Sequence, residues 1–377
     1  MKSFSEIWDP VVVVGDEETA CSAPDYVVLK YGEFKKLRND FREVPRLIHL
    51  ANNPFHAHAF LEANRPGSVL LLHEFSMHHL LTEMTLAYGN RDDYLKELAE
   101  CGLASKSVAE LRMQGVWSGF EQFTFPAIES RLGKAAGVIG HSKWILDRVL
   151  ADAPDVPTLH VPHHFSQSQK LDKSTCREVF GMRDDELIVS SLGFVTPAKC
   201  FEQIIRALAE IRSEVPPFKF WIFGELRHPA DLRKAIRKYG LDDLVVQKGY
   251  VPLDAFEAAI AASDLIVNLR YPSVGETSGT MTRAMGAGKP VVVYRHGSFA
   301  EPPCDSVVGV PLDTFDGSDL AQAFRKYLSD VELREATGTR AKAWASRVSP
   351  SDSVQLQSRF IASCYSIPLD GLERFVT

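Results

Sequence analysis

Short apolar runs alternate with helical stretches of about ten residues through the second half of this 377-residue chain. The apolar runs predict strands at Leu187–Leu192, Phe218–Phe223, Leu244–Lys248, Leu265–Asn268 and Pro290–Tyr294. The helices expected between them are Phe201–Ser213, Ala230–Tyr239, Leu253–Ala262 and Thr280–Ala287. Strands and helices in this alternation build βαβ units around a parallel sheet, with right-handed crossovers. Because ligands of such sheets bind beyond the carboxyl ends of the strands, functional residues are expected at that edge.

The first half follows the same rhythm less regularly. Its expected strands are Val11–Val14, Leu47–Leu50, Val69–Leu72 and Gly137–His141, with a helix over Lys143–Leu150 and a mostly helical stretch from Asn90 to Ser130. At Leu159–Phe165 (LHVPHHF) a further strand is expected to run into a Pro/His loop. We therefore predict an α/β fold of two Rossmann-like domains whose parallel sheets face each other across a cleft. The predicted domains are residues 1–163 and 164–348, followed by a C-terminal helix within 349–377 that crosses back to the first domain.

Composition narrows the class of protein. Hydrophobic residues make up 45% of the chain and charged residues 24%, which is typical of a soluble globular protein. The net charge of −7 argues against a dedicated nucleic-acid binder, which would carry a basic excess. No apolar run approaches the roughly 18 residues that span a bilayer. The N-terminal residues also lack the basic start and apolar run of a secretory signal.

The six cysteines are scattered without a Cys-x-x-Cys pair. This pattern indicates reduced thiols and argues against both disulfide bridges and a structural zinc site. We expect a cytoplasmic protein, either free or peripheral at the inner membrane surface.

The segment Tyr271–Val293 (YPSVGETSGTMTRAMGAGKPVVV) carries the most chemical information. A strand ends before it, a Pro/Ser/Gly turn follows, and Thr277 or Ser278 can cap the next helix. The free backbone N–H groups at such a helix start form a phosphate site at the mouth of the sheet, and Gly279 would let a ligand come close. Glu276, just before these donors, would be repelled by a phosphate and suits sugar hydroxyls instead. A capped surface helix with an exposed glutamate is the alternative.

The same segment resembles the donor-binding signature of retaining glycosyltransferases of family four, the glycosyl transferases group 1, which have the GT-B fold. The matching positions are Pro272, Ser273, Glu276, Gly279, Ala284, Met285, Gly288, Pro290 and Val291. Two departures stand out. The helix is one residue shorter between the two halves of the signature, and Arg283 occupies the place of a second glutamate that the family uses on the nucleotide ribose.

The resemblance extends to the other strand ends of the second half. Ser190–Lys199 (SSLGFVTPAK) is similar to the family's strand that ends in Gly-Arg: Gly193 is kept, Phe194 replaces the arginine, and Lys199 keeps the lysine used on the donor diphosphate. The turn at Gly224 resembles the family's Gly-rich turn after the next strand. Lys248–Pro252 (KGYVP), with Tyr250 and Val251, resembles the loop that contacts the nucleotide base through its backbone.

Because Phe194 replaces the family's arginine, the protein has one positive charge fewer to stabilise the diphosphate as it leaves the sugar. Arg270 ends the strand before the signature, so topology would bring it to the same edge as Lys199. We predict that Arg270 joins Lys199 in binding the diphosphate, whereas Arg283 lies one turn further into the helix. The alternative is that Arg270 pairs with a carboxylate at the surface.

Histidines distinguish the first half. His73 directly follows an expected strand and is the best positional match to a catalytically important histidine of the family. His78 and His79 follow on a helix, but His-Glu-x-x-x-His-His is not the zinc-protease spacing. His56, His78 and His79 can each be packing histidines instead, and His163 and His164 are expected only to shape the linker. The family's N-terminal Gly-rich loop is absent, because Gly15–Glu18 (GDEE) follows the first strand; the first βα unit is either missing or replaced.

The resemblance implies a retaining glycosyltransferase that moves a sugar from a nucleotide sugar to an acceptor hydroxyl, in glycan or polysaccharide synthesis. Glu276 and His73 are then the catalytic candidates. The donor-binding candidates are Lys199, Gly193, Arg270, Thr277, Ser278, Gly279, Tyr250, Val251 and Gly224. The expected partners are a nucleotide sugar and a glycan or lipid-linked acceptor. No cofactor is expected, and because the chain has no Asp-x-Asp, no metal is required.

Two other functions stay open: a degenerate relative that binds a sugar nucleotide without turnover, and a nucleotide-sugar epimerase. A Rossmann dehydrogenase and a P-loop enzyme are disfavoured, because no Gly-x-Gly-x-x-Gly follows a strand and Gly-Ala-Gly-Lys-Pro lacks the P-loop Ser/Thr.

Overall fold

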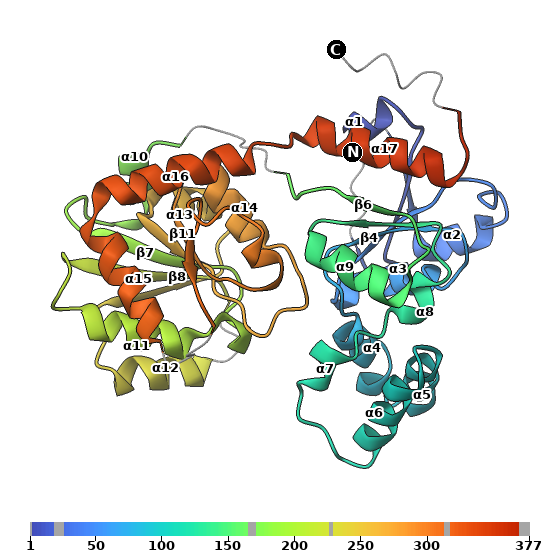
Figure 1. Cartoon of the computed structure of the whole chain (residues 1–377), viewed down its shortest axis with the longest axis horizontal. Coiled ribbons are helices and arrows are strands. Elements are labelled where there is room, and N and C mark those ends of the chain that lie inside the picture. Colours follow the sequence, from blue (N-terminus) through green and yellow to red (C-terminus); the bar gives the residue numbers. More distant parts are fainter. Residues whose placement is uncertain (1, 19–25, 165–170, 226–228, 313–316, 369–377) are drawn as a thin grey trace. The chain divides into compact units, whose positions relative to one another are not determined.

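The computed structural model describes residues 2–18, 26–164, 171–225, 229–312 and 317–368. It divides the chain into two compact units (Figure 1). Unit 1 comprises Met1–Pro162, Val274–Thr277 and Pro350–Thr377, and unit 2 comprises His163–Ser273 and Ser278–Ser349. Both contain parallel sheets with helices on the faces, so the predicted α/β class is confirmed.

The sheet of unit 1 has four parallel strands in the order β3-β4-β5-β6. They are β3 (Leu47–Leu50), β4 (Val69–Leu72), β5 (Gly137–Gly140) and β6 (Thr158–His160). Helices α3 (Ala57–Glu62) and α9 (Lys143–Asp152) pack on one face, and α17 (Pro350–Cys364) packs on the other. The close approach of α17 requires glycine at Gly137, because a Cβ there would lie 2.7 Å from the Cys364 sulfur.

The first expected strand forms, but not in this sheet. β1 (Val11–Val14) pairs in parallel only with β2 (Val27–Lys30), which the sequence did not predict, and α2 (Tyr31–Leu37) follows. The pair is preceded by α1 (Lys2–Ser5), next to which Trp8 donates a hydrogen bond of 2.9 Å to Ser358 on α17.

The helical stretch expected from Asn90 to Ser130 is broken into short helices. These are α5 (Arg91–Glu100), α6 (Leu103–Met113), α7 (Glu121–Thr124) and α8 (Glu129–Leu132). Helix α4 (His78–Met84) and the 3-10 turns η1 (Pro54–His56) and η2 (Leu86–Tyr88) come earlier in the unit. The breaks fall at glycines with positive φ, Gly102, Gly115 and Gly119. Glycine adopts this conformation without the steric cost that stops other residues, so Gly102 and Gly115 end α5 and α6, and Gly119 lies in the turn before α7.

Unit 2 contains a six-stranded parallel sheet in the order β12-β11-β10-β7-β8-β9. Its strands are β7 (Leu187–Leu192), β8 (Phe218–Phe223), β9 (Val245–Gly249), β10 (Leu265–Val267), β11 (Val291–Tyr294) and β12 (Val308–Val310). The chain builds β7, β8 and β9 outward in one direction and then returns to place β10 on the other side of β7. The strand order therefore reverses between β7 and β10, and such a switch point is where open α/β sheets bind ligands.

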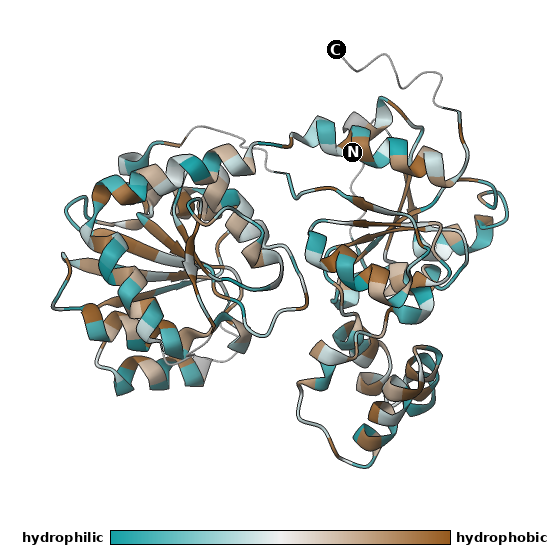
Figure 2. Cartoon of the chain, in the orientation of Figure 1, coloured by the Kyte–Doolittle hydropathy of each residue, from teal (hydrophilic) through white to brown (hydrophobic). Residues whose placement is uncertain are grey.

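Helices cover both faces of this sheet. α11 (Phe201–Ile211), α12 (Pro229–Lys238) and α15 (Ser318–Ser329) pack on one face, and α10 (Lys173–Phe180), α13 (Leu253–Ala262), α14 (Gly279–Gly286) and α16 (Val331–Ala345) pack on the other. Figure 2 shows the hydrophobic strands between helices whose outer sides are hydrophilic. The 3-10 turns η3 (Pro197–Lys199) and η4 (Gly297–Ala300) lie in the loops of the carboxyl edge.

Several predicted boundaries shift by a residue or two. The strand expected to run into a loop within Leu159–Phe165 is β6, which ends at His160, and Phe165 lies outside the described residues. Pro162 has no N–H to donate, which explains why the strand cannot continue through it.

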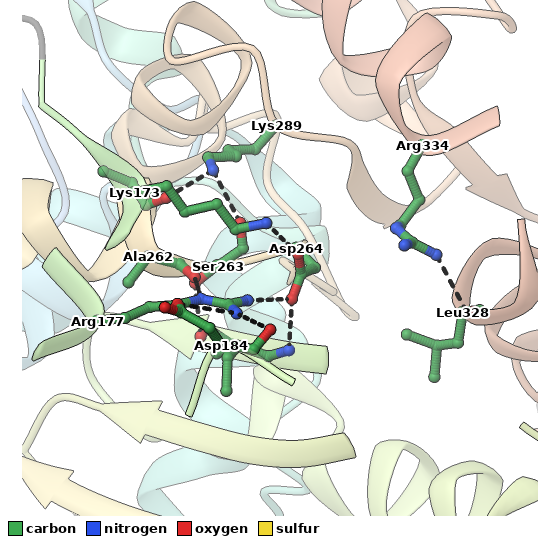
Figure 3. A network of polar contacts seen from close by, with 12 residues as sticks. Lys173, Arg177, Asp184, Ala262, Ser263, Asp264, Lys289, Leu328 and Arg334 are labelled. Atoms are coloured by element: carbon green, nitrogen blue, oxygen red, sulfur yellow. Dashed lines mark hydrogen bonds and ion pairs between the residues drawn. The ribbon is translucent and has the colours of Figure 1, made fainter. Parts of the chain in front are cut away.

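A network of ion pairs closes the amino edge of the unit 2 sheet (Figure 3). The Arg177 guanidinium, 3% exposed, donates to Asp264 at 2.6 Å and to the carbonyl oxygen of Ala262 at 3.1 Å. Asp264 also accepts from Lys173 at 2.5 Å, and Lys289 donates to the carbonyl oxygens of Ala261 and Ser263. The network holds α10 to the turns that begin β10 and β11.

The five cysteines within the described residues are free thiols. None of the helices in the described ranges is long and apolar enough to cross a membrane.

Candidate functional site

The start of α14 has the geometry of a capped helix terminus at the switch point. Ser278 is the N-cap: its hydroxyl accepts a hydrogen bond from the Met281 N–H at 3.2 Å and donates to Asn268 at 3.1 Å, just beyond β10. Nothing in the described chain lies within 4 Å of the point where a Cβ on Gly279 would stand. A ligand can therefore approach the first N–H groups of α14 from the side of Gly279.

Two glycine turns lie beside this helix start. Gly193, after β7, has φ +87°, and Gly224, after β8, has φ +150°. A Cβ on Gly224 would lie 2.2 Å from the Gly193 carbonyl oxygen, so the two turns can touch only with glycine there. A Cβ on Gly193 would lie 3.3 Å from the Lys199 ammonium and 3.7 Å from the Thr280 hydroxyl. We call these four residues, Gly193, Gly224, Lys199 and Thr280, the glycine cradle.

Lys199 is the buried cation of the glycine cradle. Its side chain is 2% exposed and donates to the carbonyl oxygen of Leu192. Burial, and secondly the neighbouring Arg270 guanidinium, hold the pKa of Lys199 well below its usual value. Both influences disfavour the charged amine. A bound anion would act in the opposite direction and favour the charged form.

Arg270 lies near Lys199, as the topology predicted. The Tyr271 N–H donates to the Ala198 carbonyl oxygen at 2.8 Å, which fixes this segment against η3, the turn that ends in Lys199. His296 donates to the Arg270 carbonyl oxygen at 2.6 Å from the other side. Arg270 also acts on the neighbouring Cys200, whose thiol pKa burial raises to about 12 against the opposing effect of the guanidinium.

The predicted base loop and the replaced arginine position carry exposed aromatic rings. Tyr250 is 75% exposed between β9 and α13, whereas Val251 is half-buried against the core. Phe194 is 49% exposed directly after Gly193. The loops meet through their backbones, because the Gly224 N–H donates to the Gly249 carbonyl oxygen at 2.7 Å.

Glu276 and Thr277 belong to unit 1, which the sequence did not predict. The carbonyl oxygen of Val274 accepts from the Phe75 N–H at 2.9 Å, and the Ser142 hydroxyl donates to the Gly275 carbonyl oxygen at 3.4 Å. Gly275 has φ +84° and packs so closely on Trp144 that a Cβ would lie 2.3 Å from the ring. The Glu276 carboxylate accepts from the Val274 N–H at 2.9 Å.

His73 follows β4 and lies two residues before Phe75, so unit 1 brings the two catalytic candidates into neighbouring segments. Its Nε2 lies 3.3 Å from Nδ1 of His49. Its ring centroid lies 5.3 Å from that of His141 and 6.2 Å from that of His56. Sequence reasoning singled out His73 but missed His49 and His141, although His141 also directly follows an apolar strand and His49 lies within one.

The remaining histidines differ from one another. His78 is fully buried, with Nδ1 donating to the Phe125 carbonyl oxygen at 2.6 Å and Nε2 at 2.7 Å from the Tyr94 hydroxyl, so it is a packing histidine. His79 is exposed, and the packing interpretation is wrong for it. Nδ1 of His163 donates to the carbonyl oxygen of His164. Over the described ranges, no group of three or more His, Cys, Asp or Glu side chains is arranged to hold a metal ion.

Comparison with known proteins finds a family similar to the second half of the chain. Residues 172–344 match the family model for glycosyl transferases group 1. A D-inositol 3-phosphate glycosyltransferase from Nocardioides sp. is 25% identical over 210 residues, which cover 52% of this chain and 45% of that protein. The chain spans about half the length of the curated relatives it matches.

Solved structures match over nearly the whole chain. Sucrose-phosphate synthase from Thermosynechococcus elongatus aligns with a TM-score of 0.70 and 15% identity, over 97% of this chain and 91% of that one. HepE from Anabaena, solved in complex with UDP, aligns with a TM-score of 0.60 and 18% identity, over 91% of this chain and 86% of that one. These likenesses confirm the α/β fold of the GT-B glycosyltransferases, and residues 172–344 are similar to the glycosyl transferases group 1 family.

Proposed function

We propose that the protein is a retaining glycosyltransferase that transfers a sugar from a nucleotide sugar to an acceptor hydroxyl. The observation that carries this proposal is the glycine cradle at the switch point of a glycosyl transferases group 1 domain. There a buried lysine, a hydroxyl and the start of α14 converge on one small space. Their charges and donors suit the diphosphate of a nucleotide sugar.

In this proposal the donor's bond between the sugar C1 and the diphosphate oxygen breaks, and a bond from C1 to the acceptor oxygen forms on the same face. The acceptor proton leaves with the diphosphate. Lys199, Arg270 and the N–H groups of α14 stabilise the negative charge that grows on the leaving group, which is the kind of electrostatic help worth several kcal/mol. Thr277, Ser278 and Gly279 border that helix start. Glu276 holds hydroxyls of the transferred sugar, and His73 acts on the acceptor side.

The base would lie against the loop of Tyr250 and Val251, and Phe194 would offer it an apolar neighbour. The structural likeness to HepE, solved with UDP, makes a uridine nucleotide the first donor to test. The acceptor can be a glycan, a lipid-linked sugar or a small polyol. Small polyols are included among the acceptors because one relative is named a D-inositol 3-phosphate glycosyltransferase. No divalent ion is needed in this scheme, because the chain itself supplies the positive charge.

The test has two stages. Thermal unfolding with a panel of nucleoside diphosphates identifies the base, because a ligand at about a hundred times its Kd adds about 2.7 kcal/mol of stability. The matching nucleotide sugars are then assayed for diphosphate release with and without acceptors. Acceptor-dependent release supports transfer, and binding without turnover supports the degenerate relative, which Phe194 and Arg283 favour. Release of an epimer or free sugar without an acceptor supports an epimerase.

Glu276→Gln sharpens the test. The amide keeps the shape of the side chain but accepts fewer hydrogen bonds, so transfer should fall by about tenfold or more while diphosphate affinity stays within about twofold. Glu257→Gln, on α13, is a control that should change neither quantity. Equal activity of Glu276→Gln and the parent removes Glu276 from the site.

A further inference from the structure

Each of the four parallel strands of the unit 1 sheet has a histidine at or within one residue of its carboxyl end. His49 is the third residue of β3, His73 and His141 directly follow β4 and β5, and His160 ends β6. The register sets Leu72 beside Gly140, so His73 and His141 are neighbours across the edge where ligands of parallel sheets bind. The family motif supplied a reason for only one of these residues, His73.

The His73 ring lies within hydrogen-bond distance of His49. Nδ1 of His49 lies 3.3 Å from Nε2 of His73, and the ring centroids are 5.5 Å apart at an interplanar angle of 34°. Two ring nitrogens can form this hydrogen bond only if one carries a hydrogen and the other offers a lone pair. The pair therefore shares one proton, and the tautomer of His73 is tied to that of His49.

His49 is well placed to hold another ring in position. It lies within a strand whose flanking residues, Ile48 and Leu50, are buried in the core. Its carbonyl oxygen accepts from Nδ1 of His56 at 2.9 Å, which ties the end of β3 to η1. The His49 side chain itself is exposed, so its ring is held by the strand backbone and by its contact with His73 rather than by burial.

The groups around the pair are mostly imidazoles. His56 from η1 and His141 beyond β5 face His73, and His160 reaches the His141 carbonyl oxygen at 3.4 Å. Glu74, the next residue in the chain, accepts from the Asn52 N–H at 2.9 Å. A proton added to one ring raises the cost of protonating the next, which favours a fixed tautomer over a shared cation.

We propose that His49 is a positioning residue that fixes the ring orientation and the tautomer of His73. If Nε2 of His73 donates this hydrogen bond, Nδ1 of the neutral ring carries no proton. If Nε2 accepts it, Nδ1 carries the proton. What His73 then does with Nδ1 rests on the proposed function; which nitrogen carries the proton does not.

The experiment is nitrogen-15 NMR of the full chain with labelled histidines, in which His73→Asn assigns the His73 signals. The parent should show one neutral tautomer of His73. His49→Phe should give both tautomers and a shifted pKa of His73. His49→Asn, whose amide can stand where Nδ1 stands, should retain the single tautomer. His79→Asn, at an exposed histidine, is the control and should leave the His73 signals unchanged.

If transfer is observed, its kinetics give a second readout. His49→Phe should lower kcat by about tenfold or more and displace the pH profile, with the donor KM within about twofold. His49→Asn should recover most of kcat. The proposal would be overturned if His73 had the same tautomer and the same pKa in His49→Phe as in the parent. If His49→Phe destabilises the fold, His49→Ala takes its place, and an unchanged single tautomer of His73 in that variant would overturn the proposal equally. An inactive parent would contradict the proposed function and leave the NMR test intact.

Discussion

The two edges of the unit 2 sheet each bury a basic side chain, but the two side chains have different partners. At the amino edge, Arg177 is bound to the Asp264 carboxylate and to backbone carbonyl oxygens, as Figure 3 shows. At the carboxyl edge, Lys199 is equally buried, but its hydrogen-bond acceptor is a neutral carbonyl oxygen and Arg270 is the charge that acts on its pKa. A charge that a fold buries for its own stability is normally compensated inside the fold. A buried lysine beside an arginine gains its charge most readily when an anion binds, so the comparison indicates that the amino edge stabilises the fold and that the carboxyl edge suits an anionic ligand.

The largest effect should come from Asp264→Asn at the amino edge. Removal of the carboxylate leaves the Arg177 guanidinium buried without its counter-charge, which should cost about 3–5 kcal/mol of unfolding free energy. The unfolding free energy of unit 2 is measured in urea, with hydrogen exchange of the β7 and β8 amides as the probe. Lys173→Ala removes a half-exposed partner of the same carboxylate and should cost less than about 1 kcal/mol. If both variants lost the same unfolding free energy, burial of the Arg177–Asp264 ion pair would not be what determines the loss of stability.

At the carboxyl edge, Arg270→Ala should weaken binding of a nucleoside diphosphate by about tenfold or more, because a charge-assisted hydrogen bond contributes about 1.5–3 kcal/mol. Titration calorimetry measures the affinity. Combined with Lys199→Ala, the loss should be less than the sum, because both cations contact one group. Arg212→Ala, whose guanidinium pairs with Asp243, is the control. Unchanged affinity with a small loss of stability would instead place Arg270 in a structural ion pair.

Lys199→Met should leave stability nearly unchanged, in contrast to Asp264→Asn. The methionine fills similar space without a buried charge, and the lost hydrogen bond to Leu192 is offset by the removed desolvation cost. The unfolding free energy should stay within about 1 kcal/mol of the parent or rise. A loss of about 3 kcal/mol or more would show that Lys199 is a structural residue like Arg177.

The pH dependence of binding should carry the smallest effect. In the free protein the pKa of Lys199 is lowered from its usual value of 10.5, and a bound diphosphate favours the charged amine. Binding should therefore take up a proton in the interval between the lowered pKa and the pKa of the complex, so affinity falls as pH rises through it. Calorimetry in buffers of different ionisation enthalpy measures the uptake. Uptake that persists in Lys199→Met would assign the proton to another group.

Local patterns in the sequence predict much of unit 2. The strands over Leu187–Leu192 and Phe218–Phe223 were predicted to the residue, because each is a buried apolar run between clear turns. The helix cap at Ser278 follows from the same local logic. The strands Val27–Lys30 and Val308–Val310 were missed. Each stands at the edge of its sheet, and the pairing with the neighbouring strand that holds it extended does not show in its own pattern.

The candidate site was harder to predict because it depends on contacts between distant segments. The touching turns at Gly193 and Gly224 and the contact of His49 with His73 are set by strand register, which the sequence does not reveal. The docking of Val274–Thr277 on Phe75 likewise depends on tertiary packing. Proximity of Arg270 to Lys199 could be foreseen, because both follow strands that adjoin at the switch point.

Titration of the full-length chain with UDP, comparing the parent, Lys199→Met and Lys219→Met, tests most directly whether the carboxyl edge of unit 2 is a diphosphate site. Lys219 lies near the start of β8 and donates to the Asp243 carbonyl oxygen, so it is a matched lysine at the opposite edge. UDP should bind the parent and Lys219→Met equally and bind Lys199→Met at least about tenfold more weakly. Equal affinity for all three proteins would contradict the assignment of the glycine cradle as the diphosphate site.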